Sequence, residues 1–125
     1  MSIEKLDHVN LRTTRLEEMI AWYRDVLGLN VGPRPDFPFK GAWLYAGEAA
    51  CVHLVEIDGD EATGSETALK LEHFAFTASE REEFESRLKE LGVTCRRVEN
   101  EEFATIACNM CDPDGNHIHV DFRSG

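Results

Sequence analysis

The sequence predicts an α+β protein made of two tandem βαβββ modules. Two amphipathic segments typical of helices alternate with short strand-like runs, and the same order of elements occurs twice along the chain. The 125-residue length suits one compact unit with a hydrophobic core. We therefore expect a single domain over residues 1–125, with module 1 at about 3–57, a linker at 58–69 and module 2 at about 70–124.

Two helices are indicated at 13–28 (TTRLEEMIAWYRDVLG) and 79–92 (SEREEFESRLKELG). Each starts with a Ser or Thr followed three residues later by Glu, the pattern of a capping box, and each ends at Gly. Apolar residues at helical spacing predict one core-facing stripe on each helix. The capping pairs are Thr14–Glu17 and Ser79–Glu82, the stops are Gly28 and Gly92, and the stripes are Leu16, Met19, Ile20, Tyr23 and Leu27, then Phe84, Leu88 and Leu91.

The strand-like segments repeat as well. LDHVNLRT (6–13) aligns with LEHFAFTA (71–78) at an offset of 65, which aligns His8 with His73. VHLVE aligns with IHVDF at an offset of 66, which aligns His53 with His119. An internal duplication is therefore visible in the sequence itself. The remaining strands are predicted at 29–34, 42–47 and 50–57 in the first half, and at 93–98, 103–111 and 116–122 in the second.

The last predicted strand, in PDGNHIHVDF (113–122), places imidazoles on one face of a sheet. Successive strand residues point to opposite faces, so every second residue shares a face. One face is apolar and packs on the helix, and the other carries two imidazoles and a carboxylate. The apolar residues are Ile118, Val120 and Phe122, and the polar ones are His117, His119 and Asp121.

The charge and the apolar runs restrict the partners. A net charge of −11 excludes a basic nucleic-acid footprint and makes a cation the more natural guest. No apolar run reaches membrane-spanning length, and the start MSIEKLDH contains no apolar signal core. We therefore expect a cytoplasmic protein with a small-molecule substrate and neither nucleic-acid nor membrane partners.

The four cysteines are expected to be free thiols in a reducing compartment: Cys51, Cys95, Cys108 and Cys111. Cys108 and Cys111 form a CxxC, a spacing also found in zinc and redox sites. In a strand this spacing sends the two side chains to opposite faces, and no second CxxC is present. We therefore favour small buried apolar residues over a metal or redox site.

Two other features of the sequence, a proline-rich segment and two polar residues, each allow two interpretations. The segment PRPDFPFKG (33–41) is either a stiff edge connection or a rim that carries Phe37 and Phe39 over a pocket. Tyr45 and Asn10 either line a pocket or serve core and surface roles.

Four of the five histidines occupy equivalent places in the repeat, and this points to metal binding. Imidazoles on neighbouring strands, about 4.8 Å apart, can converge on one ion. Neutral imidazole binds zinc, iron, nickel and copper. The alternative is a set of polar histidines in a cleft without metal. Four histidines in repeat register favour the metal site, with His8, His53, His73 and His119 as ligands.

The chain resembles the vicinal oxygen chelate proteins, the glyoxalase/bleomycin-resistance/extradiol-dioxygenase superfamily. The resemblance rests on LDHVNLRTTRLEEMIAWYRDVLGLNV, WLYAGEAACVHLVEI, LEHFAF and DPDGNHIHVDF. It implies paired βαβββ modules that curl into a half-open barrel around a divalent transition metal (Fe²⁺, Zn²⁺, Mn²⁺ or Ni²⁺). It also implies a homodimer, with each site able to draw ligands from both chains. The family's ligand positions fall here on His8, His53, His73 and His119.

The sequence departs from the family pattern at two of these positions. His119 stands where the pattern PDG-x-x-x-E has glutamate, and His53 stands where glyoxalase I has glutamate. An all-imidazole site leaves the full dipositive charge on the ion but contains no built-in base. Asp121 and His117 are the nearest catalytic candidates, or else they orient the ligands.

Three functions follow from these observations. The first is a metal-dependent enzyme, a lyase, isomerase or dioxygenase, acting on a small metabolite that chelates the metal through vicinal oxygens. The second is a metal-free small-ligand-binding protein of the bleomycin-resistance type. The third is an intracellular metal-binding module without turnover.

Overall fold

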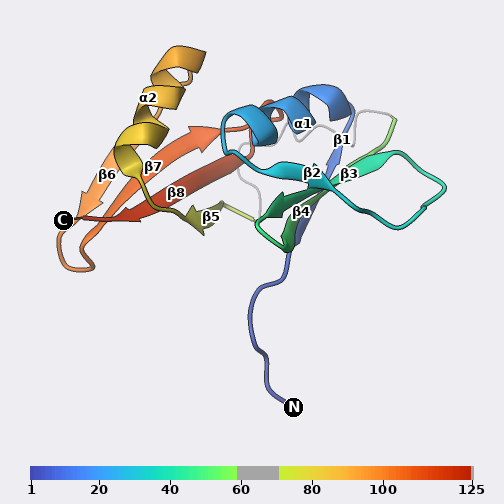
Figure 1. Cartoon of the computed structure of the whole chain (residues 1–125), viewed down its shortest axis with the longest axis horizontal. Helices are drawn as coiled ribbons and strands as arrows, with labels where there is room; N and C mark the ends of the chain where they lie inside the picture. Colours follow the sequence, from blue (N-terminus) through green and yellow to red (C-terminus); the bar gives the residue numbers. More distant parts are fainter. Residues whose placement is uncertain (59–70, 125) are drawn as a thin grey trace. The chain divides into compact units, whose positions relative to one another are not determined.

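The computed structural model describes residues 1–58 and 71–124. The chain divides into two compact units, Met1–Gly64 and Ser65–Gly125, called module 1 and module 2 below and described separately. Of the expected linker at 58–69, all but Asp58 lies outside the described residues. Each module contains one helix and four strands in the order β-α-β-β-β (Figure 1). The α+β class and the two βαβββ modules predicted from the sequence are confirmed.

Module 1 is a four-stranded sheet with the strand order β1-β4-β3-β2. The outer strand β1 runs parallel to β4, whereas β3 is antiparallel to both β4 and β2. Parallel neighbours need a crossover, and the helix together with β2 and β3 supplies it. The elements are β1 (Val9–Thr13), α1 (Leu16–Asp25), β2 (Asn30–Gly32), β3 (Gly41–Ala46) and β4 (Ala49–Glu56).

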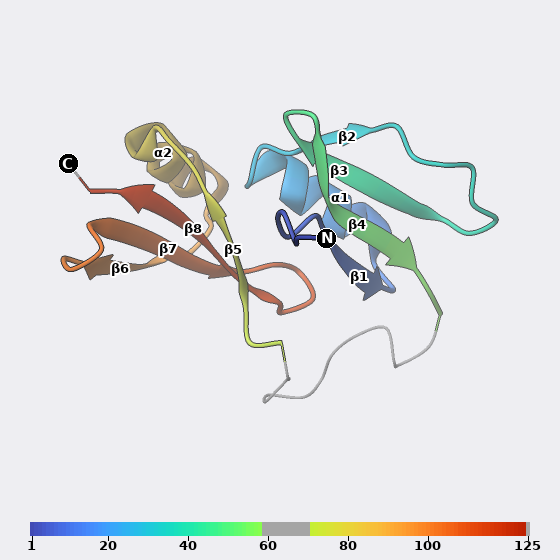
Figure 2. The ribbon, with the colours of Figure 1, turned by 90° about the horizontal axis from the view of Figure 1, so that it is seen from below.

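Module 2 repeats this topology with the order β5-β8-β7-β6. Here β5 is parallel to β8, and β7 is antiparallel to β8 and β6. Figure 2 shows β5 crossing at the edge of the sheet next to β8, as the register requires. The elements are β5 (Phe74–Thr77), α2 (Arg81–Leu91), β6 (Arg96–Asn100), β7 (Thr105–Cys111) and β8 (His117–Arg123).

In each module the helix lies over one face of the sheet (Figure 1). In β8 the burial alternates strictly, with every second residue buried. Phe84 of α2 packs against Phe122 of β8 with ring centroids 5.5 Å apart. In module 1 the buried core is formed by Leu16, Met19, Tyr23, Leu44, Val52 and Leu54. We call the opposite face, which points away from the helix, the histidine face.

The helix starts differ from the predicted capping boxes. The residue before α1 is Arg15 and the residue before α2 is Glu80, and neither helix start has a side-chain cap. Instead, buried Thr13 at the end of β1 accepts a hydrogen bond from the Arg15 N–H at 3.0 Å. Glu80 has φ 59°, a left-handed conformation. In both helices the capping position falls one residue after the predicted Thr14 or Ser79, on Arg15 or Glu80, so the capping prediction is wrong.

The helix ends agree with the sequence. Gly92 has φ 69°, and the N–H of Val93 donates to the carbonyl of Leu88 at 2.9 Å, closing the last turn. Gly28 has φ 75°, and its N–H donates to the carbonyl of Arg24 at 3.0 Å. Gly92 is the capping residue of α2, whereas α1 ends at Asp25 and Gly28 follows two residues after its cap Val26; both glycines have the left-handed conformation that glycine tolerates best.

The cysteines differ from the expectation of free thiols. Cys95 and Cys108 form a disulfide with Cα atoms 5.6 Å apart. The strand pairing explains this disulfide. Cys108 of β7 pairs with Arg97 of β6, and Cys95 lies two residues before Arg97, so it is on the same face as Cys108 and diagonally opposite it. Cys51 and Cys111 are free. Cys108 is buried as expected, but Cys111 is exposed, so the prediction of a buried side chain is wrong there.

The packing of α2 gives a test of the core. Leu88 is 2% exposed, whereas Leu91 on the same helix is 48% exposed, so the prediction of Leu91 on the core-facing stripe is wrong. Leu88→Ala should lower the free energy of unfolding by about 2–5 kcal/mol, because it leaves a cavity against the sheet. Leu91→Ala is the matched control and should cost less than about 1 kcal/mol. Urea denaturation measures both, and equal losses would contradict the assigned helix face.

Candidate metal centre

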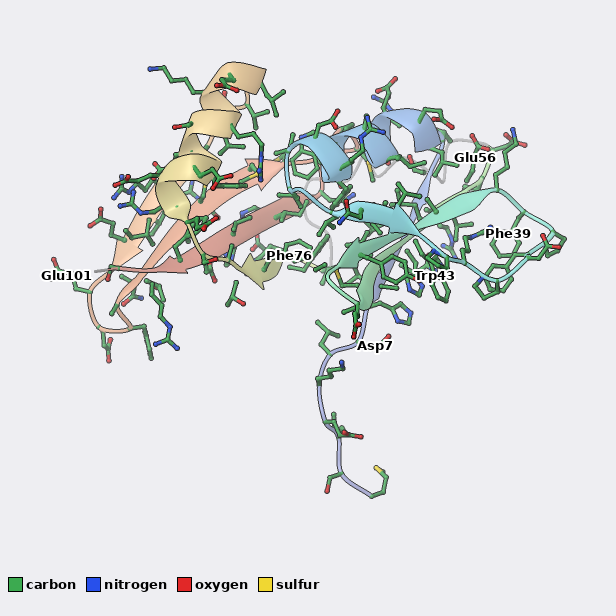
Figure 3. All side chains as sticks on the ribbon, viewed as in Figure 1. Asp7, Phe39, Trp43, Glu56, Phe76 and Glu101 are labelled. Atoms are coloured by element: carbon green, nitrogen blue, oxygen red, sulfur yellow. A yellow bond between two sulfur atoms is a disulfide. The ribbon has the colours of Figure 1, made fainter. Side chains whose placement is uncertain are left out.

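The histidines of module 1 lie in a stack of three rings. His8 directly precedes β1, and His53 in β4 pairs with Trp43 in β3. The rings of Trp43 and His53 are 4.0 Å apart with an interplanar angle of 10°, and those of His53 and His8 are 3.8 Å apart at 12°. Figure 3 shows Trp43 on the side of the sheet that points away from α1. The histidine face of module 1 therefore carries both predicted ligands side by side.

His53 is held as a neutral ring. It is 6% exposed, and its Nε2 lies 3.0 Å from the carbonyl oxygen of Ala50. A carbonyl only accepts, so Nε2 carries the proton and Nδ1 keeps a lone pair. Burial lowers the pKa of His53 below its ordinary value of 6.5, and the neighbouring His8 lowers it further. A neutral imidazole with one free lone pair is the form that binds metals.

His8 has a carboxylate partner. Its Nδ1 donates to Oδ2 of Asp7 at 2.7 Å, which leaves Nε2 as the available nitrogen. This hydrogen bond lowers the pKa of the Asp7 carboxyl. Metal-binding imidazoles commonly donate their second N–H to a carboxylate in this way, which fixes the tautomer and the ring orientation.

Module 2 contains the equivalent pair, His73 and His119. Their ring centroids are 4.5 Å apart. His73 Nδ1 donates to Oε1 of Glu72 at 2.5 Å, and His119 Nδ1 donates to Oδ1 of Asp121 at 2.5 Å. In the neutral form of both rings the lone pair is therefore on Nε2. The pattern seen at His8 occurs again in the second half of the duplication.

His117 has a different environment on the same face. Its Nε2 lies 2.8 Å from Oδ1 of Asn109, and its Nδ1 lies 3.4 Å from Oε2 of Glu72. The Asn109 amide is oriented by its own Nδ2, which donates to the carbonyl of Arg96 at 3.2 Å. Oδ1 of Asn109 is therefore the acceptor, and Nε2 of His117 carries the proton.

Glu72, His73 and His117 form a candidate metal-binding group. One ligating atom from each residue lies within 4.8 Å of the other two. The hydrogen bond from His73 lowers the pKa of the Glu72 carboxyl most, and His117, which can donate from Nδ1 only when its ring is protonated, lowers it further. A cavity of about 610 Å³ adjoins this group, and its lining includes Glu72, Thr94, Asn109, Cys111 and His117.

Each module thus brings its two predicted ligands together, His8 with His53 and His73 with His119. Their role as metal ligands remains a prediction. The predicted catalytic residues Asp121 and His117 lie on the same face of β8, and each is already hydrogen-bonded to a neighbour. Their catalytic role also remains a prediction.

Asp7 and Glu72 were missed by the sequence reasoning. Both directly precede a candidate ligand, as DH and EH, at the same offset of 65 as the histidines themselves. This duplicated acid–histidine pair was the available signal. Asn109 left no comparable signal, because the β7–β8 register pairs it with His119, and its hydrogen bond with His117 is a diagonal contact between the two strands.

The remaining candidates lie in module 1. Tyr45 donates its hydroxyl to the carbonyl of Pro33 at 2.5 Å, and Asn10 is exposed opposite His53 in the register. Phe37 and Phe39 stack with ring centroids 5.0 Å apart, and the Arg34 guanidinium lies near both rings. Figure 3 shows Phe39 in the loop between β2 and β3. A rim over a pocket remains a prediction for this loop.

Known proteins provide a comparison with the whole chain. The Glyoxalase/Bleomycin resistance protein/Dioxygenase superfamily matches residues 5–120. "Glyoxylase I 4" of Arabidopsis thaliana is 29% identical over 96% of this chain and 71% of its own length. "Glutathione transferase FosA" of Serratia marcescens is 28% identical over 94% of this chain and 80% of its own length. A glyoxylase/bleomycin resistance protein/dioxygenase domain from Frankia sp. EAN1pec shares the fold, with a TM-score of 0.79, 20% identity and coverage of 98% of this chain and 99% of that one.

The chain belongs to the Glyoxalase/Bleomycin resistance protein/Dioxygenase superfamily, the vicinal oxygen chelate superfamily that the sequence motifs predicted. Among residues 1–58 and 71–124, neither helix is long and apolar enough to cross a membrane.

The environment of His53 predicts a pH dependence. Its pKa in the folded protein lies below 6.5, so as the pH falls the unfolded chain binds a proton at this position before the folded one does. His53 therefore lowers the free energy of unfolding as the pH falls below 6.5. In chelator-treated protein, His53→Gln should lose stability less steeply than wild type between pH 7.5 and 5.5, measured by urea denaturation. Equal slopes would show that His53 titrates as in the unfolded chain.

Proposed function

We propose that this protein is a metal-dependent enzyme of its superfamily. It acts on a small metabolite that offers two adjacent oxygens to the metal, in lyase, isomerase or dioxygenase chemistry. The proposed ligands are His8, His53, His73 and His119. The observation that carries the proposal is shared by all four rings: one ring nitrogen lies at a hydrogen-bond acceptor, so the other nitrogen of the neutral ring keeps a lone pair.

The residues present suit a divalent transition metal. Imidazole and carboxylate donors bind Fe²⁺, Zn²⁺, Mn²⁺ and Ni²⁺, whereas Mg²⁺ and Ca²⁺ prefer oxygen ligands alone. Two exposed carboxylates, Asp7 and Glu72, lie next to candidate ligands, and the net charge of −11 also favours a cation. The histidine face therefore has the donors, their orientation and the charge that such an ion requires.

The neighbouring groups would bind and orient the substrate and handle its protons. When bound, the ion would supply the positive charge that polarises adjacent oxygens of the substrate. Asp121 and His117 are the proposed acid–base groups. A proton would be held or moved at the carboxylate of Asp121, which already accepts from His119, or at Nδ1 of His117, whose other nitrogen is held by Asn109.

Metal binding is the first test. Chelator-treated protein without a histidine tag should bind Zn²⁺, and His73→Gln should weaken the affinity by at least about tenfold in calorimetry. Lys89→Gln, on an exposed position of α2, is the control and should bind as wild type. If less than about a tenth of an equivalent of any transition metal is retained after reconstitution, the metal-dependent function is wrong.

Turnover is the second test. The protein loaded with Fe²⁺, Zn²⁺, Mn²⁺ or Ni²⁺ is screened against α-ketoaldehydes, catechols and epoxides, whose oxygens can reach a metal. We expect turnover of one class, and loss of at least about a hundredfold in kcat/KM in His73→Gln, because the ion is lost with its ligand. Metal binding without turnover of any class would instead favour a metal-binding module.

A metal-free binding protein of the bleomycin-resistance type is the second candidate. The stack of Trp43, His53 and His8 favours it, since stacked rings also form a flat lining for an aromatic ligand. This function requires ligand binding in the presence of chelator. The homodimer and the cytoplasmic location expected from the sequence remain predictions.

A further inference from the structure

We propose that Glu72, His73 and His117 are the ligands that module 2 gives to the divalent metal, with His117 in place of His119. This inference rests on the proposed function, because it specifies the ligands of the same ion. It changes the donor set in module 2 from two imidazoles to two imidazoles and one carboxylate.

The three residues meet at one corner of the sheet. Glu72 and His73 directly precede β5, and His117 is the first residue of β8, where Phe74 pairs with Ile118. One ligating atom of each residue lies within 4.8 Å of the other two. Two ligands of one ion, each bound at about 2.0–2.1 Å, are at most about 4.2 Å apart. Small side-chain movements therefore suffice to bind an ion here.

His117 presents the correct nitrogen. Asn109 accepts the Nε2 proton of His117, and the carbonyl of Arg96 fixes the Asn109 amide. In the neutral ring the lone pair is therefore on Nδ1, the atom that lies 3.4 Å from the Glu72 carboxylate. A metal-binding imidazole typically donates its other N–H to a fixed acceptor, and Asn109 is such an acceptor.

Glu72 faces two imidazoles instead of one. It contacts His73 through Oε1 and His117 through Oε2. In the described part of the chain its ion-pair partners are these two rings, with no Lys or Arg among them. When His117 is neutral, its lone pair faces a carboxylate oxygen, which is unfavourable. A cation between the two atoms converts that repulsion into two bonds.

The resulting donor set also balances the charge of the ion. One carboxylate offsets one unit of a dipositive charge, which neutral imidazoles leave uncompensated. Two histidines with one carboxylate bind Fe²⁺ in oxygenases and Zn²⁺ in hydrolases, and both kinds of site keep positions open for substrate. The adjoining cavity of about 610 Å³, lined in part by Glu72 and His117, leaves room for a small molecule beside such an ion.

The assignment divides the roles on β8. An ion at this corner takes the place of the proton that His73 Nδ1 shares with Glu72, and that proton moves to Nε2 of the neutral ring. His117 then has no free nitrogen, because Asn109 holds the other one. The acid–base role proposed above falls to Asp121, which stays hydrogen-bonded to His119.

The test is a titration of wild type and five variants of the full chain with Co²⁺ and with Zn²⁺, followed by the visible absorption of bound Co²⁺ and by calorimetry. The variants are Glu72→Gln, His73→Gln, His117→Gln, His119→Gln and the control Glu90→Gln, which removes an exposed carboxylate from α2. Glu72→Gln and His117→Gln should each weaken binding by at least about tenfold and change the Co²⁺ spectrum. Circular dichroism confirms that each variant is folded.

Every outcome decides the assignment. If Glu72→Gln and His117→Gln bind as wild type while His73→Gln does not, the assignment is overturned and the proposed metal-dependent function stands. If wild type binds neither ion, both fail. Should His119→Gln bind as wild type while the other two lose affinity, the assignment is supported, and His119 is removed from the ligand set. Asn109→Ala should then weaken binding by about 10–100-fold through His117.

Discussion

The packing of a single helix on each sheet is the constraint on which the other features depend. Because α1 and α2 each lie over one face of a sheet (Figure 1), side chains on that face are buried, and burial alternates residue by residue along β7 and β8. In β8 this alternation separates Ile118 and Val120 from His117 and His119. A shift of one residue in register would bury the imidazoles and expose the core, so the packing fixes the site as firmly as the fold.

The periodicity and the internal repeat predicted all ten elements, because both reflect burial. The alternation in β8 and the stripe on α2 are consequences of which side chains are buried, and burial is encoded in the residue types themselves. The repeat also aligned His53 with His119 where the apolar pattern of β4 was ambiguous, and the structure places the His53 ring against His8. The two modules share one topology, with strand orders β1-β4-β3-β2 and β5-β8-β7-β6. The alignment therefore also predicted the face of the sheet to which the His53 side chain points.

Features that depend on the exact path of the backbone were not predictable in this way. The capping pattern at Ser79 is present in the sequence, but the chain enters α2 through Glu80 in a left-handed conformation and the cap is not formed. The Cys95–Cys108 disulfide depends on where β6 begins relative to β7, which the apolar pattern left open. The contact between Asn109 and His117 likewise depends on one register between two strands.

The carboxylates beside the histidines can have two roles, orienting an imidazole or binding the metal, and the sequence alone cannot distinguish them. Asp7 and Asp121 each contact one imidazole through one oxygen, which is the arrangement that orients a ring and fixes its tautomer. Glu72 contacts two imidazoles through two oxygens, and in its neutral form one of those rings, His117, presents a lone pair instead of a proton. An orienting carboxylate has no need of that second contact, whereas a ligand must share its cation with other donors. Because of this difference in geometry, we assign Glu72 as a metal ligand and Asp121 as the acid–base group.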